Sequence, residues 1–216
     1  ILVLAGSAGG GGKPSEAFLS PAGKFVTVNG VRIHYLEWGS AGPSVILLHG
    51  MGDNARTWEK LIPFLAKDFH IIAPDRRGSG ESDKPTEGYD FQTLTDDVAF
   101  LAEHLNLGPV IVVGHSFGGL SALAHALAGR HRPAGLVLVE ANPLGLLRAA
   151  GDLRHYAMFE AVTAPYFAAF ERGDVEAARG VIDFYGGAGS FDAMPPKVRA
   201  YVVATTPVNV RDWSSG

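Results

Sequence analysis

The stretch that decides the fold is VIVVGHSFGG, residues 110–119, in which four apolar residues run directly into Gly-His-Ser-Phe-Gly. A short apolar run that ends in glycine is typical of a buried strand in a parallel sheet. The small-residue segment after it predicts a helix, and a sharp turn between the two lifts the hydroxyl of Ser116 clear of the sheet. Gly114 and Gly118 flank this turn and carry no Cβ that would clash with a strained backbone. The stretch therefore predicts that Ser116 is a nucleophile.

A second turn motif, His49-Gly50-Met51, follows another short apolar run. A serine that attacks an acyl carbon needs two N–H donors directed at the oxygen that becomes negatively charged. We expect the backbone N–H of Phe117, directly after the nucleophile, to be one donor and the backbone N–H of Met51 to be the other. His49 and His115, which belong to the two turn motifs, are expected to make local hydrogen bonds.

Strand and helix signals alternate through the first two thirds of the chain. Asn29-Gly30 joins two β-rich runs and predicts a hairpin with a type I′ turn. Pro63 predicts that the helix before it is short or kinked. Asp75 is expected to support the turn after its strand, with Arg76 and Arg77 as possible ion-pair partners. Alternation with helices predicts a doubly wound, mostly parallel α/β sheet with helices on both faces, built on the apolar runs SVILL, HIIAP, VIVVG and GLVLV.

The pattern divides the chain into three parts. Residues 1–24 are a flexible Gly-rich leader, or the tail of a signal peptide, so the chain is cytoplasmic or exported. Residues 25–143 form the sheet and its helices. Residues 144–216 lose the strand signals and predict a helical cap or lid. Its apolar side chains are candidates for lining a substrate pocket, namely Tyr156, Met158, Phe159, Phe167, Phe170 and Phe191.

Composition excludes several classes of function. The chain is 47% hydrophobic and 19% charged, so it can bury a substantial core. Its formal net charge of −4 argues against a nucleic-acid partner, and no apolar run is long enough for a transmembrane segment. The absence of cysteine excludes disulfides and thiolate catalysis. No metal-ligand spacing occurs, so we expect neither a metal nor a cofactor.

The motifs SVILLHGMGDNARTW, IIAPDRRGSGESDKP, VIVVGHSFGG and GLVLVEANP, in this order, resemble the α/β-hydrolase superfamily. The resemblance is close over residues 25–144 and looser over the cap. It implies a cofactor-free Ser-His-acid hydrolase that cleaves esters, lactones or related acyl bonds of a small apolar substrate through an acyl-enzyme. Because the nucleophile is Ser and not Asp, the resemblance argues against epoxide hydrolases and haloalkane dehalogenases, which attack with a carboxylate.

The partners of Ser116 are the open part of this interpretation. The resemblance offers Glu140, at the end of the fourth apolar run, as the triad acid; a polar residue that bonds local backbone is the alternative. In the family the catalytic histidine comes after the cap, and none of the 8 histidines fits that role. We therefore interpret the sequence as lacking the C-terminal part of a hydrolase, which leaves residues 136–140 as an uncovered sheet edge.

Two other functions stay open. One is a hydrolase-fold protein that binds a ligand without turnover, or an inactive fragment, since fold does not determine function. The other is a cofactor-free haloperoxidase or a C–C bond hydrolase that uses the same serine. The sequence leaves the oligomeric state open.

Overall fold

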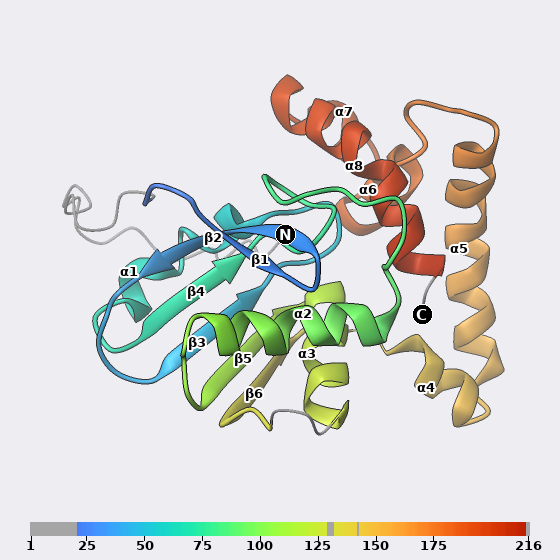
Figure 1. The fold of residues 1–216 in the computed structure, drawn as a ribbon. Coiled ribbons are helices and arrows are strands. Elements are labelled where there is room, and N and C mark those ends of the chain that lie inside the picture. The colour runs from blue at the N-terminus through green and yellow to red at the C-terminus, as the bar shows by residue number, and fades with distance from the viewer. Residues whose placement is uncertain (1–20, 129–131, 142, 215–216) are drawn as a thin grey trace, which may run out of the picture.

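The computed structural model describes residues 21–128, 132–141 and 143–214 (Figure 1). Of the leader expected over residues 1–24, residues 1–20 lie outside the described residues. Across the described ranges, none of the helices has both the length and the apolar character needed to cross a membrane.

A six-stranded mixed sheet with the order β1-β2-β4-β3-β5-β6 forms the centre of the molecule. The hairpin of β1 and β2 turns at Asn29 (φ 48°) and Gly30 (φ 74°), as the type I′ prediction requires. The pairs β1–β2 and β2–β4 are antiparallel, and the pairs β4–β3, β3–β5 and β5–β6 are parallel, so the predicted fold class is confirmed. The strands are β1 (Lys24–Val28), β2 (Val31–Trp38), β3 (Ser44–Leu48), β4 (His70–Pro74), β5 (Val110–His115) and β6 (Gly135–Val139).

The two faces of the sheet bury different residues of the same strands. Ile46 and Leu48 of β3 face α2 (Phe91–His104) and α3 (Phe117–Ala128), where they pack in one core cluster. Val45 and Leu47 face the other way. There they pack under η2 (Ala55–Trp58) and α1 (Ile62–Leu65), whose first turn accommodates Pro63. A continuous apolar run buries both faces of a central strand, which is why these strands carry no polar alternation.

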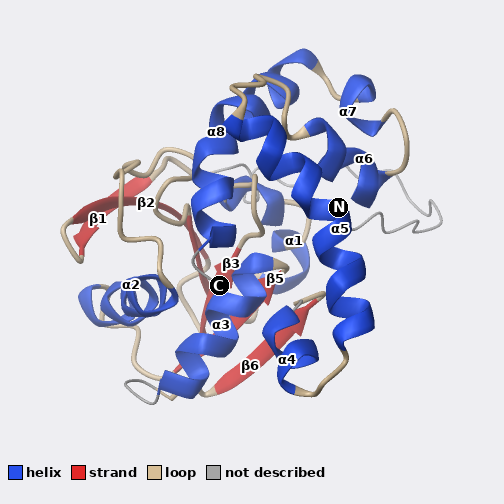
Figure 2. Ribbon diagram, turned by 90° about the vertical axis from the view of Figure 1, so that its right-hand side faces the viewer, coloured by secondary structure: helices blue, strands red, loops and turns tan. Residues whose placement is uncertain are grey.

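A helical layer lies beyond the carboxyl ends of the parallel strands (Figures 1 and 2). We call this layer, residues 143–214, the cap. Its helices are α4 (Leu144–Ala149), α5 (Leu153–Glu171), α6 (Arg179–Gly186), α7 (Ser190–Ala193) and α8 (Pro196–Ser214). Phe191 is fully buried in the cap's own core, where Phe167 and Phe170 also pack, while Met158 is exposed. These three phenylalanines thus stabilise the cap from within.

β6 is the last strand of the sheet, as expected for residues 136–140. Its outer edge pairs with no strand among the described residues. Leu136, Val137 and Leu138 are 36%, 46% and 41% exposed, so both faces of this edge carry accessible apolar surface. Such an edge favours pairing with another strand.

Candidate active site

Ser116 occupies a strained turn between β5 and α3. Its φ is +53°, a left-handed conformation that non-glycine residues adopt at an energetic cost. The turn is held by hydrogen bonds: the Ser116 N–H donates to the Val139 carbonyl (2.9 Å), and the Ser116 carbonyl accepts from Gly119 N–H (2.8 Å). The local geometry therefore has the features of a nucleophile turn at the carboxyl edge of the sheet.

Gly114 and Gly118 are required for close approach of main chains. A Cβ on Gly114 would overlap the carbonyl oxygen of Gly118. A Cβ on Gly118 would overlap the Leu48 carbonyl oxygen and lie 2.5 Å from the His49 carbonyl oxygen. The strain of the turn lies in Ser116 itself, and the two glycines are not among the residues with positive φ. α3 thus begins in direct contact with the end of β3.

His49 determines the orientation of the peptide that carries the expected Met51 donor. Its Nε2 accepts the backbone N–H of Arg76 (3.0 Å), so the proton is on Nδ1, which donates to the Gly50 carbonyl (2.7 Å). Burial, and secondarily the Arg76 guanidinium, lowers the pKa of His49 to about 4, so the ring is neutral at pH 7. In a trans peptide the N–H points opposite to the carbonyl. The Met51 N–H is therefore directed away from the His49 ring.

The two turns that carry the expected oxyanion donors lie close to each other. A Cβ on Gly50 would be 3.3 Å from the Ser116 Cβ, which shows how closely the two turns approach. In the described part of the chain, neither the Met51 nor the Phe117 backbone N–H donates a hydrogen bond. Both amides thus lack an acceptor within the described residues.

The acid and base are not assembled around Ser116 in the described residues. Glu140 has a φ of +50°, and its side chain is 72% exposed. Its Oε2 lies 3.8 Å from His115 Nε2. No described histidine hydrogen-bonds to Ser116, and His131 lies outside the described residues. Several histidines bond to carboxylates elsewhere, in the pairs His34–Asp75, His70–Glu37 and His155–Asp152.

Arg76 is a feature of the site that the sequence did not identify. Asp75, its expected partner, instead bonds to the buried His34 (2.8 Å). The Arg76 guanidinium donates to Asp212 of α8 (3.2 Å) and to the His49 carbonyl (3.3 Å), and its carbon lies 4.7 Å from the centre of the Phe117 ring. Burial raises the pKa of Asp212, against the opposing effect of Arg76. A buried cation thus contacts both turns of the site.

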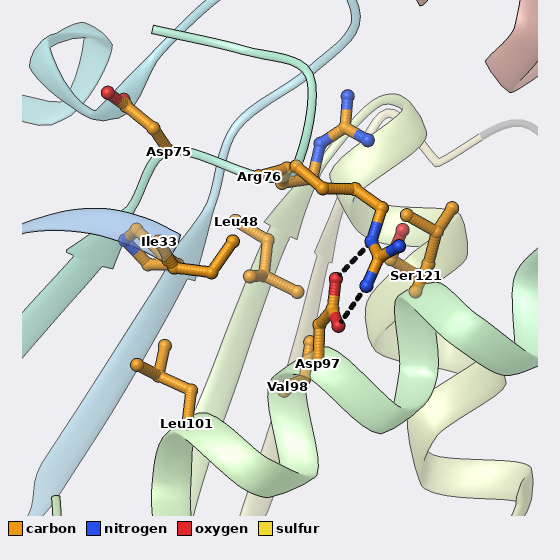
Figure 3. A pocket seen from close by; sticks show the side chains of 11 residues that line it. Ile33, Leu48, Asp75, Arg76, Asp97, Val98, Leu101 and Ser121 are labelled. Carbon is orange, nitrogen blue, oxygen red and sulfur yellow. Dashed lines mark hydrogen bonds and ion pairs between the residues drawn. The ribbon is translucent and has the colours of Figure 1, made fainter. Parts of the chain in front are cut away.

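A small cavity lies beside this arrangement (Figure 3). Its volume of about 30 Å³ suits a single water molecule. Arg77 lines it and donates two hydrogen bonds of 2.6 Å to Asp97, whose pKa burial raises. Ser116 and Met51 are not in the cavity wall, so the cavity is separate from the proposed nucleophile turn. Among the described residues, no three His, Asp or Glu side chains are placed to bind a metal ion.

The family model described as "alpha/beta hydrolase fold" matches residues 43–172. A soluble epoxide hydrolase of Corynebacterium sp. (strain C12) is 42% identical over 125 residues, covering 58% of this chain and 43% of the relative. A non-heme chloroperoxidase of Streptomyces lividans is 34% identical over 183 residues, covering 76% of this chain and 66% of the relative. The chain thus spans less than two thirds of either relative.

One solved structure has the same fold over most of the chain. It is that of Est816, described as an N-acyl homoserine lactone degrading enzyme. It is 27% identical, with a TM-score of 0.65, and the match covers 88% of this chain and 70% of that protein.

Proposed function

The chain belongs to the α/β hydrolase fold family, and from that premise we propose that it is a serine hydrolase of esters, lactones or related acyl bonds. The observation that carries this proposal is the geometry of Ser116. Its strained φ of +53° is held by hydrogen bonds between β5, β6 and α3, directly beside the Gly50 turn. Strain that the surroundings maintain is typical of functional residues.

The proposed reaction begins with attack of Ser116 Oγ on the acyl carbon of a small apolar substrate. The developing oxyanion accepts the backbone N–H groups of Met51 and Phe117, which have no acceptor among the described residues. The alcohol or amine leaves, and water hydrolyses the resulting acyl-enzyme. The cycle needs a histidine to take and return the serine proton, a role that no described histidine fills. Glu140 is our candidate for the acid that orients it.

The nucleophile favours acyl substrates over epoxides, although one relative is an epoxide hydrolase. A carboxylate that opens an epoxide forms an ester, which water then cleaves. A serine that opened an epoxide would form an ether, which has no carbonyl for water to attack. A serine at position 116 therefore completes a catalytic cycle only when the intermediate is an acyl ester.

A second function differs only in what attacks the acyl-enzyme. The chloroperoxidase relative motivates it. If hydrogen peroxide replaces water, the product is a peracid, which can oxidise a halide without a metal. The same serine and the same oxyanion donors serve both reactions.

The test is covalent labelling of the natural gene product, whose intact mass is measured first. We expect a fluorophosphonate to label Ser116 and to abolish hydrolysis of p-nitrophenyl acetate. Ser116→Ala should remove both label and turnover. Ser121→Ala is the matched control, because its buried hydroxyl donates to the Phe117 carbonyl within α3 (3.2 Å). If the folded protein is neither labelled nor active, the ligand-binding alternative replaces the hydrolase.

A further inference from the structure

Helix α8 of the cap contacts the turn that carries the proposed Met51 donor. We call residues 49–53 the oxyanion loop. The backbone N–H of Gly52 donates to Oδ1 of Asn209, 157 residues later in the chain, over 3.1 Å. Asn209 is buried, at 7% exposure, and this loop amide is the partner of its carbonyl oxygen. A buried side-chain oxygen with a single well-placed donor is costly to remove.

Two further contacts join the same face of α8 to this region. Asp212 lies three residues after Asn209, so both side chains project from one side of the helix. Asp212 bonds to Arg76, whose Nε donates to the His49 carbonyl at the start of the loop. Tyr201, about two turns earlier, donates its hydroxyl to the Asp53 carbonyl (2.9 Å) at the end of the loop. α8 therefore contacts the loop directly at Gly52 and Asp53, and through Arg76 at His49.

These contacts fix the peptides on both sides of Met51. The Gly50 carbonyl belongs to the peptide that carries the Met51 N–H and is held by His49. The next peptide carries the Gly52 N–H and is held by Asn209. Given the hydrolase function proposed above, we propose that Asn209 is a positioning residue: from the cap, it keeps the Met51 N–H directed at the oxyanion. The placement of α8 then controls the rate of the chemical step.

The kinetic test uses Asn209→Ala, with Asn209→Asp to restore an acceptor. Removing an oxyanion donor lowers kcat by about 10²–10³-fold, and a loosened donor should cost about 10-fold. We expect Asn209→Ala to lower kcat by roughly that factor with KM changed less than about twofold, and Asn209→Asp to recover much of the loss. Thr206→Val is the control, because the Thr206 hydroxyl donates to the Val202 carbonyl within α8 (3.0 Å).

A second readout does not depend on turnover. Hydrogen exchange of the Gly52 amide should accelerate at least 10-fold in Asn209→Ala and stay unchanged in Thr206→Val. If the wild type is active and Asn209→Ala keeps its kcat, or loses only substrate affinity, the positioning role is wrong. If the wild type is inactive, the hydrolase proposal fails. The exchange rate then still decides whether Asn209 fixes the oxyanion loop. An exchange rate of the Gly52 amide that is the same in Asn209→Ala and the wild type would show that it does not.

Discussion

Replacing Asp212 with Asn should destabilise the protein by about 3–5 kcal/mol. The Arg76 and Asp212 side chains are 5% and 1% exposed, and their charged atoms lie 3.2 Å apart. At an effective dielectric constant of about 20, two unit charges at that distance attract by about 5 kcal/mol. Asparagine keeps the shape of the side chain but leaves the guanidinium buried without its counter-ion. Removing one partner of a buried pair typically costs about 3–5 kcal/mol.

The assay is urea unfolding at pH 7.5 of the wild type, Asp212→Asn, Arg76→Gln and the double variant. We expect the double variant to lose about 2 kcal/mol less than the two single losses combined, because the second change removes the charge that the first left unpaired. Arg56→Gln is the surface control. Arg56 is 47% exposed and pairs with Glu59, so its loss should stay within about 0.5 kcal/mol. Single losses below about 1 kcal/mol that add without coupling would refute the buried ion pair.

Two further perturbations test the oxyanion loop and the nucleophile turn. The pKa of His49 is about 4 in the folded protein and about 6.5 in the unfolded chain. The contribution of this pKa difference to the free energy of unfolding, on the order of 3 kcal/mol, is therefore complete above pH 6.5 and is lost as the pH falls towards 4. The unfolding free energy of the wild type should therefore fall more steeply over that interval than that of His49→Asn, and parallel curves would contradict the assignment. Gly118→Ala should cost more than about 3 kcal/mol, because its methyl would overlap two main-chain carbonyl oxygens. Gly30 has a positive φ, but a methyl added there would have no atom within 4 Å. Gly30→Ala should therefore cost only about 1–2 kcal/mol, from backbone conformation alone. Equal shifts in thermal unfolding for the two alanines would contradict the overlap at Gly118.

The sequence predicts the sheet because its signals are local. The run from Val110 to the glycine at 114 is a buried strand, and Asn29-Gly30 turns the hairpin in the conformation that these residues tolerate. The turn at Ser116 could be predicted for the same reason, since strand, turn and helix are adjacent in the chain. In each case the decisive contacts lie within a few residues.

The polar partners of the site could not be predicted in the same way. Arg76 pairs with Asp212, 136 residues away, and Asp75 pairs with His34, 41 residues away. Which buried charge meets which depends on how α8 packs against the loops that follow β3 and β4, and no spacing in the sequence reports that. One signal was present: Tyr201, Asn209 and Asp212 follow a helical spacing in a segment rich in valine and threonine. A polar stripe on such a helix indicates a face that bonds to another element.

The overlap that a methyl on Gly118 would make with Leu48 and His49 has a consequence for how such a protein can diversify. Main-chain atoms set the spacing between Gly118 and the end of β3, while the side chains of His49 and Asn209 hold the peptides of the oxyanion loop. A cap grafted from a relative would inherit that spacing without adjustment. What the graft must bring is an oxygen at the place of Asn209, to accept the N–H of Gly52, and a carboxylate at the place of Asp212, to pair with Arg76.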